Sequence, residues 1–301
     1  YAQLISLEMG KPLREAQYEI AKTITAFDYY IANAPAFLAP QPVSSNATRS
    51  YIRFEPLGII FSVMPWNFPF WQVFRFAVPT LISGNVTILK HAPCVPQCAK
   101  AIEQLFADSG APANIFRNYF LINEDAAGVI ADPRVHGVSF TGSDATGSIL
   151  AAQAGKHIKK CVMELGGNDA FIVLDDADLD VAIAGAVKSR SINSGQSCNG
   201  AKRFIVMDKV AEAFTTKLTD AVRALKVGDP TDENTAIGAL ARKDLMEKVN
   251  RQVADSIAGG AVAHYGNTPP ATGGNYVTPV VLTGVKPGIT SFEEEIFAPV
   301  W

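Results

Sequence analysis

From residue 57 onward, short apolar runs alternate with segments whose apolar residues recur at helical spacing. Such alternation is typical of βαβ units that build a mostly parallel sheet. A helix is expected around Ile102 and Phe106, which share one face, and Gly110 follows as a stop signal. The pattern predicts strands at Gly58–Val63, Val86–Leu89, Asn114–Leu121, Gly137–Phe140 and Lys160–Met163.

A second series of strands and helices follows the glycine pair Gly166–Gly167. A strand is predicted at Ala170–Leu174, another in "KRFIVMD", and helices in "DLDVAIAGAVKSR" and "DLMEKVNRQVADSIAGGA". We therefore expect a domain boundary at the glycine pair. Residues 38–56 differ from both series, because two prolines lead into the alternating "SYIRFEP", which predicts an antiparallel arm.

The composition is that of a globular protein with a sizeable core, since 48% of the 301 residues are hydrophobic and 18% are charged. The net charge is −3 and the basic residues are scattered, so neither nucleic acid nor a membrane is expected as a partner. No apolar run approaches the roughly 20 residues of a membrane span, and the start lacks a signal-peptide pattern. A cytoplasmic protein is expected. The chain opens without Met and stops at Trp301, which indicates a fragment.

The cysteines and histidines do not form a metal-ligand pattern. Cys94 and Cys98 stand four apart where a helix begins, which would suit a redox pair but is more often chance packing. The four histidines show no grouping and are interpreted as surface or edge residues. No metal is expected.

Two polar residues stand at positions that suit catalysis. Asn67 lies between the prolines of "PWNFP", and a rigid amide donor is what an oxyanion needs; a capping role is equally acceptable. Glu164 ends an apolar strand, where partial desolvation would raise its pKa and make it a usable base. A paired, structural glutamate is the alternative.

Two strand ends offer groups for a phosphate or ribose. Lys90 ends the strand in "ILKHAP", although an exposed strand-end lysine is the commoner case. In "SFTGSDATGSI", Gly142, Ser143 and Gly147 lie between a strand and a helix, so backbone N–H groups and a helix N-terminus face a ligand. This is not the G-x-G-x-x-G fingerprint and is weak alone.

Cys198 lies in "NSGQSC", a polar loop before a strand. An unperturbed thiol is only a few per cent thiolate at pH 7, so a nucleophile needs an exposed polar loop with nearby donors. A filler cysteine would sit in an apolar run, as Cys161 does. The pattern favours a nucleophile at Cys198.

These stretches together resemble the aldehyde dehydrogenase superfamily. The motifs "PWNFP", "LKHAP", "FTGS" with a later Gly, "ELGG", "NSGQSC" and "EEEIFAP" occur in that order over essentially the whole chain. The segments "MPWNFPFWQVFR" and "KKCVMELGGNDAFIVLDDADLD" most resemble those of bacterial NAD(P)-dependent succinate-semialdehyde dehydrogenases. Family members begin before Tyr1 and continue past Trp301, so this chain is expected to lack both ends.

The resemblance implies roles for individual residues. Cys198 would be the nucleophile, Glu164 the general base, and Asn67 the amide that shares the oxyanion hole with the Cys198 backbone N–H. NAD or NADP is the implied cofactor, with Glu295 at the nicotinamide ribose and Phe297 beside the nicotinamide. The implied cofactor-binding positions are Trp66, Lys90, Pro93, Gly142, Ser143, Gly147, Leu165, Glu295 and Phe297.

Substrate and cofactor choice follow from three positions within the resemblance. Arg75 matches a position where such enzymes carry an arginine for the substrate carboxylate, a bidentate task that suits a guanidinium. A second arginine of some members is Ile192 here, while Arg190 lies two residues earlier. Pro93 stands where NAD-restricted members often have a glutamate, so NADP is expected to be accepted as well as NAD.

We expect an α/β fold like that of aldehyde dehydrogenases, with a Rossmann-type NAD(P)-binding domain (1–37 and 57–165), a β oligomerisation arm (38–56) and an α/β catalytic domain (166–301). The full protein would be a homo-oligomer, dimer or tetramer, that oxidises succinate semialdehyde or a similar aldehyde. Alternatives are a broad-specificity aldehyde dehydrogenase, a truncated nucleotide-binding paralogue without activity, and a cysteine hydrolase. Ala298 replaces a usual Gly, which would be strained if the turn there needs a positive φ.

Overall fold

The computed structural model describes residues 1–266, 268 and 273–301, which form two compact units. Unit 1 contains Tyr1 and Tyr18–Leu165, and unit 2 contains Ala2–Gln17 and Gly166–Trp301. The change from one unit to the other after Leu165 falls at the glycine pair that the sequence marked.

The N-terminal segment differs from the expected division, because Ala2–Gln17 is part of unit 2 and not of the first domain. Contacts within unit 2 explain this. The Leu13 N–H donates to the Pro230 carbonyl at 2.8 Å, and the Glu15 carboxylate accepts the Asn193 N–H.

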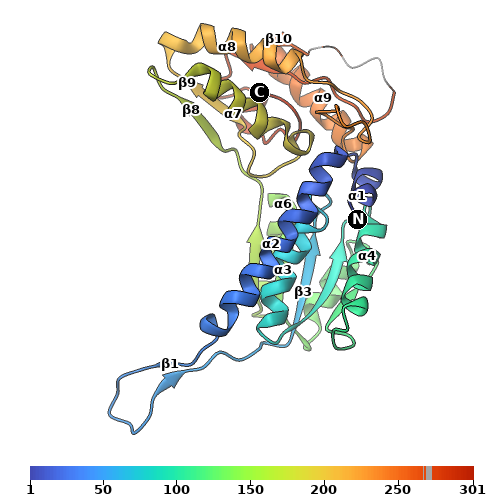
Figure 1. The fold of residues 1–301 in the computed structure, drawn as a ribbon, viewed down its shortest axis with the longest axis vertical. Helices are drawn as coiled ribbons and strands as arrows, with labels where there is room; N and C mark the ends of the chain where they lie inside the picture. Colours follow the sequence, from blue (N-terminus) through green and yellow to red (C-terminus); the bar gives the residue numbers. More distant parts are fainter. Residues whose placement is uncertain (267, 269–272) are drawn as a thin grey trace. The chain divides into compact units, whose positions relative to one another are not determined.

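Unit 1 is built on a parallel five-stranded sheet in the order β5-β4-β3-β6-β7. Figure 1 labels its central strand, β3. The first strand of this sheet along the chain is the central β3. Strands β4 and β5 follow on one side of it, and β6 and β7 then follow on the other. Open α/β sheets bind ligands at the carboxyl ends of strands beside such a reversal, here between β3 and β6. The strands are β3 (Ile59–Met64), β4 (Val86–His91), β5 (Phe116–Asn118), β6 (Val135–Thr141) and β7 (Lys160–Glu164).

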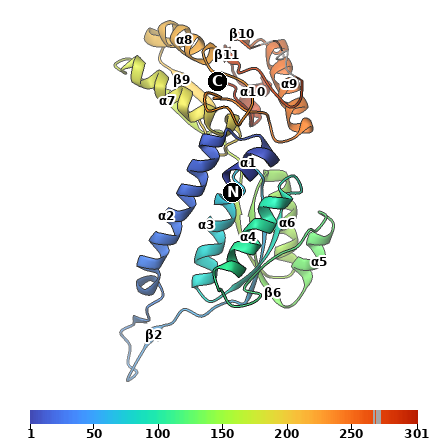
Figure 2. The same ribbon diagram turned by 45° about the vertical axis from the view of Figure 1, so that its right-hand side comes forward.

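Helices lie against this sheet (Figure 2), and apolar side chains fill the interface. Residues of α5 and α6 enclose Phe61 and Phe140, while the rings of α3, α4 and β5 form a series in which Phe106 lies 4.6 Å from Phe116. The bounds are α2 (Leu13–Phe37), α3 (Trp71–Ile82), α4 (Pro96–Asp108), α5 (Asp125–Ala131) and α6 (Asp144–Lys156).

Between α2 and β3 the chain forms a hairpin in which β1 (Gln41–Pro42) and β2 (Tyr51–Ile52) pair antiparallel. The antiparallel geometry agrees with the prediction for this arm, although each strand has only two residues. The side chains of Tyr51, Ile52 and Phe54 are all exposed.

Unit 2 combines a parallel strand pair with an antiparallel one. The parallel pair is β8 (Ala170–Val173) and β9 (Arg203–Val206), and the antiparallel pair is β10 (Val262–Tyr265) and β11 (Val281–Thr283). Its helices are α1 (Ala2–Met9), α7 (Leu179–Ser191), α8 (Asp208–Arg223), α9 (Lys243–Ala258), the short α10 (Thr290–Glu293) and the 3-10 turn η1 (Ile192–Gly195).

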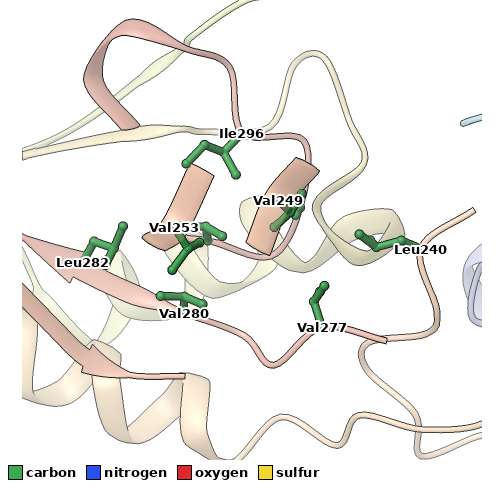
Figure 3. Packing of buried hydrophobic residues seen from close by; sticks show 9 residues of the cluster. Leu240, Val249, Val253, Val277, Val280, Leu282 and Ile296 are labelled. Carbon is green, nitrogen blue, oxygen red and sulfur yellow. The ribbon is translucent and has the colours of Figure 1, made fainter. Parts of the chain in front are cut away.

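An apolar cluster in unit 2 anchors the segment that carries Glu295 and Phe297. Ile296 is 5% exposed and belongs to the same buried cluster as Val253 of α9 and Leu282 of β11, which Figure 3 shows. Because the residue between Glu295 and Phe297 is buried in this core, both neighbours are held at fixed positions on the surface of the cluster.

The predicted strands are confirmed with one shortened case. Strand β5 begins at Phe116, because Asn114 adopts a left-handed backbone with φ 67° that cannot belong to a strand. Helix α8 was not singled out from the sequence, although the buried Phe214, Leu218 and Val222 recur every four residues.

Candidate active site

The loop that carries Asn67 follows β3 and is fixed by two buried side chains. Asn67 is 4% exposed. Helix α3 begins only at Trp71 with Phe70 as its N-cap residue, so Asn67 is not the N-cap of this helix. The Glu19 carboxylate instead accepts the N–H groups of Phe70 at 2.9 Å and Trp71 at 3.0 Å. A carboxylate at this end also suits the helix dipole.

His91, at the end of β4, holds the other side of the same loop. The two shorter contacts, from Nε2 to the Pro69 carbonyl at 3.0 Å and from the Ala92 N–H to Nδ1 at 2.9 Å, favour the neutral Nε2–H form, while the Met64 carbonyl lies 3.3 Å from Nδ1. Burial lowers the pKa of His91 to about 4, against the opposing hydrogen bond to Pro69. The interpretation of His91 as a surface or edge residue was therefore wrong.

Lys90 lies beside His91 at the same strand end and is only 3% exposed. The commoner explanation, an exposed strand-end lysine, does not apply. Desolvation lowers the pKa of the ammonium, while Glu124 and Asp125 act in the opposite direction. Pro93 follows on the surface and presents no carboxylate. The end of β4 thus offers a buried cation at the edge where ligands bind.

At the end of β6 the glycines serve close packing. A Cβ on Gly142 would lie 2.5 Å from the Phe140 ring, and one on Gly147 would lie 2.5 Å from the Leu165 side chain. The Gly142 N–H donates to the Glu164 carbonyl at 3.0 Å. Ser143 is the N-cap of α6, and its Oγ accepts the Thr146 N–H. The helix N-terminus therefore lies where the sequence predicted it.

Glu164 ends β7, an edge strand that pairs only with β6 in the sheet. Its side chain is 54% exposed and forms an ion pair with Arg75 at 3.4 Å. The predicted desolvation is absent, because the open edge leaves Val162 60% exposed as well. Arg75 also donates to Thr141 Oγ at 3.5 Å. Both lie in an open groove of about 480 Å³ along the sheet.

The loop before Cys198 has an unusual backbone. Asn193, Ser194 and Gly195 have consecutive left-handed φ values of 54°, 55° and 76°. Two non-glycine residues in this region cost free energy, which the surroundings must supply. Gln196 does so in part, because its Nε2 donates to the Asn193 carbonyl at 3.1 Å and its Oε1 accepts the Ala241 N–H at 3.0 Å.

The expectation of an exposed loop was wrong, because Asn193 to Ser197 are all buried. Cys198 itself is a free cysteine and is partly exposed at the end of this rigid segment. Cys161, taken as the example of a buried filler, is exposed because it lies on the edge strand β7. Cys161 is therefore more exposed than Cys198, which is the reverse of what their sequence neighbours indicated.

The segment with Glu295 and Phe297 packs directly against this loop. A Cβ on Gly195 would lie 2.2 Å from the Ala298 carbonyl carbon. The expected strain at Ala298 is not found, since only Asn114, Ile158, Asn193 and Ser194 are non-glycine residues with positive φ among those described. The requirement for glycine falls on Gly195 instead.

Arg190 belongs to the same support. It is 1% exposed, and its Nε donates to the Val300 carbonyl at 2.8 Å while Nη2 donates to the Ile296 carbonyl. Burial lowers the pKa of its guanidinium to about 10. Because Arg190 binds backbone inside unit 2, it is a structural residue and not a replacement for the substrate arginine absent at Ile192.

The candidate residues thus fall into one group in each unit. In unit 1, the ends of β3, β4, β6 and β7 bring one group to a single sheet edge: Trp66, Asn67, Lys90, Pro93, Gly142, Ser143, Gly147, Glu164 and Leu165. Arg75 joins it from α3. In unit 2, the packing of Gly195 on Ala298 brings the Cys198 loop to the segment of Glu295 and Phe297.

Sequence reasoning did not identify Glu19, His91 and Arg190 as supports of the site. Each is a charged or titratable side chain buried by contacts with distant segments, and local patterns carry no signal for such contacts. Among the described residues, no group of three His, Cys, Asp or Glu side chains is placed to hold a metal ion. Nor is any helix in the described part of the chain long and apolar enough to cross a bilayer.

The model of the aldehyde dehydrogenase family matches residues 1–301 of the chain. The chain belongs to the aldehyde dehydrogenase family. It is 46% identical over 299 residues to the succinate semialdehyde dehydrogenase Sad of Escherichia coli (strain K12), covering 99% of this chain and 65% of that protein. A probable NADP(+) succinate-semialdehyde dehydrogenase of Synechocystis sp. is also 46% identical, with 100% and 66% covered.

A solved structure gives the same result for the fold. The succinic semialdehyde dehydrogenase of Streptococcus pyogenes in complex with NADP+ superimposes with a TM-score of 0.97 at 38% identity, covering 100% of this chain and 66% of that one. The predicted family resemblance and the aldehyde dehydrogenase fold are confirmed. The chain spans slightly less than two thirds of the two curated relatives' length.

Proposed function

We propose that the protein oxidises succinate semialdehyde, or a similar short aldehyde with a carboxylate, to the carboxylic acid with NAD(P)+. The observation that carries the proposal is Cys198, a partly exposed free thiol at the end of a buried, hydrogen-bonded loop in a chain of this family. The Escherichia coli and Synechocystis relatives named for this reaction support the substrate class.

The reaction begins at the Cys198 sulfur. Its thiolate adds to the aldehyde carbon, and the oxygen becomes an alkoxide that the Asn67 amide and the Cys198 N–H stabilise by hydrogen bonds. NAD(P)+, when bound, would supply the hydride acceptor, and loss of hydride from this carbon would leave a thioester on Cys198. The Glu164 carboxylate then takes a proton from water, the hydroxide adds to the thioester carbon, and the C–S bond breaks to release the acid and the thiolate.

The residues at the sheet edge fit a dinucleotide. Lys90 provides a buried cation, Ser143 begins α6 at the strand end, and the order of the strands reverses beside them. These residues, together with Trp66 and Glu295, would hold the cofactor. Since position 93 is a proline, no carboxylate there repels a 2′-phosphate, and we propose that NADP is used as well as NAD.

Arg75 is proposed as the group that binds the substrate carboxylate. Its guanidinium is about one third exposed in the groove beside Glu164, and this ion pair is a weak, solvent-screened one that a substrate carboxylate can replace. The same groove thus holds the proposed base and the proposed specificity residue.

A cytoplasmic homo-oligomer completes the proposal. The exposed apolar side chains of Tyr51, Ile52 and Phe54 on the hairpin arm suit a contact with a second copy, and Cys161 and Cys198 are free thiols, as is usual in a reducing compartment. Size-exclusion chromatography with light scattering tests the assembly, and a monomer at micromolar concentration would contradict it.

The test of the activity is a panel of charged and uncharged aldehydes with NAD+ and NADP+ on the complete gene product. We expect reduction of the cofactor with succinate semialdehyde and its loss in Cys198→Ala; turnover that persists in this variant would refute the mechanism. Arg75→Ala should lower kcat/KM for succinate semialdehyde far more than for an uncharged aldehyde. Arg117→Ala, which removes an exposed arginine of unit 1, is the matched control. Equal losses for both aldehydes would favour a broad-specificity enzyme.

A further inference from the structure

Lys202 is a buried lysine that the proposed mechanism does not use. Its side chain is 2% exposed and lies four residues after Cys198, just before β9. A lysine is rarely buried unless its charge is paired, because removing an ammonium from water is costly. The contacts of this ammonium should therefore reveal why it is retained inside unit 2.

The Lys202 ammonium touches both parts of the proposed site in unit 2. Nζ donates to the Cys198 carbonyl at 2.6 Å and to the Gly200 carbonyl at 3.3 Å. It also lies 3.0 Å from Glu295 Oε1, as an ion pair. One buried cation thus joins the backbone of the candidate nucleophile to the carboxylate proposed to bind the nicotinamide ribose.

The Glu295 carboxylate has little freedom apart from this contact. A Cβ on Gly166 would lie 2.3 Å from Glu295 Oε2, so the carboxylate packs against the glycine of "ELGG". The backbone on both sides is held independently, because Gln252 donates to the Glu295 carbonyl at 3.3 Å and Arg190 donates to the Ile296 carbonyl. Lys202 forms an ion pair with the carboxylate itself.

We propose that Lys202 is a positioning residue that couples cofactor binding at Glu295 to the placement and reactivity of the Cys198 thiol. The inference rests on the proposed function, in which Glu295 binds the cofactor and Cys198 is the nucleophile. A cofactor hydroxyl that binds the Glu295 carboxylate would change the strength of its ion pair with Lys202. The strength of the hydrogen bond from Lys202 to the Cys198 carbonyl would change with it. Cofactor occupancy and the nucleophile loop are then energetically linked.

The test measures the rate at which iodoacetamide alkylates Cys198, with and without saturating NADP+, by mass spectrometry of the Cys198 peptide. In the wild-type enzyme we expect NADP+ to change this rate about fivefold or more, the lower end of usual coupling between sites. In Lys202→Met the ratio should fall close to one. Lys202→Arg, which retains a cation, should restore part of it.

Lys217→Met is the matched control, because Lys217 is an exposed lysine of unit 2 whose ion pair is with Asp180. It should keep the wild-type ratio. A merely structural Lys202 would lower the melting temperature and leave the ratio unchanged in the folded protein. If Lys202→Met does not fold, Glu295→Gln gives the same readout, since it removes the other charge of the pair.

The inference is overturned if NADP+ has the same effect on alkylation in the folded Lys202→Met or Glu295→Gln variant as in the wild type, or if the wild type shows no effect. Failure of the proposed function gives a different result: no aldehyde oxidation by the wild type, or oxidation that survives Cys198→Ala.

Discussion

The buried imidazole of His91 makes a defined prediction about stability in acid. Burial lowers its pKa from 6.5 to about 4 in the folded protein. Between these values the unfolded chain binds a proton that the folded chain does not, so the stability of the fold decreases as the pH falls from 6.5 towards 4. A tenfold difference in proton affinity is worth about 1.4 kcal/mol, so the whole effect is roughly 3 kcal/mol, of which about 2 kcal/mol is lost between pH 7 and pH 5.

The perturbation is His91→Gln, which retains an N–H for the Pro69 carbonyl and an oxygen for the Ala92 N–H but does not titrate. Urea unfolding at pH 7 and pH 5, followed by tryptophan fluorescence, measures the free energy of unfolding. Trp66 lies in the loop that His91 holds and Trp71 follows it, so both report on this part of unit 1. Between pH 7 and pH 5, the wild type should lose about 2 kcal/mol more than the variant.

The control is His157→Gln, which removes an exposed imidazole at the end of α6 and should follow the wild-type pH profile. Equal losses of stability in the wild type and His91→Gln would refute the reasoning. That result would mean that His91 accepts a proton in the folded state, and hence that it is not held neutral between the two backbone groups.

Three further substitutions test the supports of the proposed site. Glu19→Ala should lower the free energy of unfolding in urea by about 1–3 kcal/mol and should also lower kcat, because the N–H groups of Phe70 and Trp71 lose their acceptor. Glu19→Gln should retain most of the stability and most of kcat. Equal effects of the two substitutions would contradict the capping role. Gly195→Ala should lower the free energy of unfolding by at least about 2 kcal/mol, because φ is 76° and a backbone atom lies 2.2 Å from the new Cβ. Gly155→Ala, which faces open space on α6, should be neutral or should raise this free energy by about 0.5–1 kcal/mol. Arg190→Met should lower the melting temperature by several degrees, because the carbonyls of Val300 and Ile296 lose their donor. Lys188→Met, on the exposed face of the same helix, should leave the melting temperature unchanged. Similar melting temperatures for the two variants would contradict the anchoring role.

Much of the fold could be predicted from local pattern. The strands of unit 1 are short apolar runs between turn signals, so β3, β4, β6 and β7 were located to within two residues. The change of unit at Gly166–Gly167 also carried a local signal. By contrast, the membership of Ala2–Gln17 in unit 2 depends on contacts such as Glu15 with Asn193, which are far apart in the sequence.

The chemistry of the candidate residues followed from residue type and motif order, but their environments did not. Glu164 was expected to be desolvated because its sequence neighbours are apolar, yet β7 is an edge strand and its side chains are exposed. The polar loop before Cys198 was expected to be exposed, yet Gln196 and Asn193 satisfy its backbone internally and it is buried. Hydrophobicity along the chain predicts burial only where the sheet continues on both sides.

The central claim is that Cys198 carries the substrate as a thioester. Glu164→Gln should remove the proposed base, so incubation with succinate semialdehyde and NADP+ should give a burst of about one NADPH per site and then stop. Mass spectrometry of the quenched protein should find a succinyl group on the Cys198 peptide. No burst, or an acyl group on another residue while Cys198 remains free, would contradict the account.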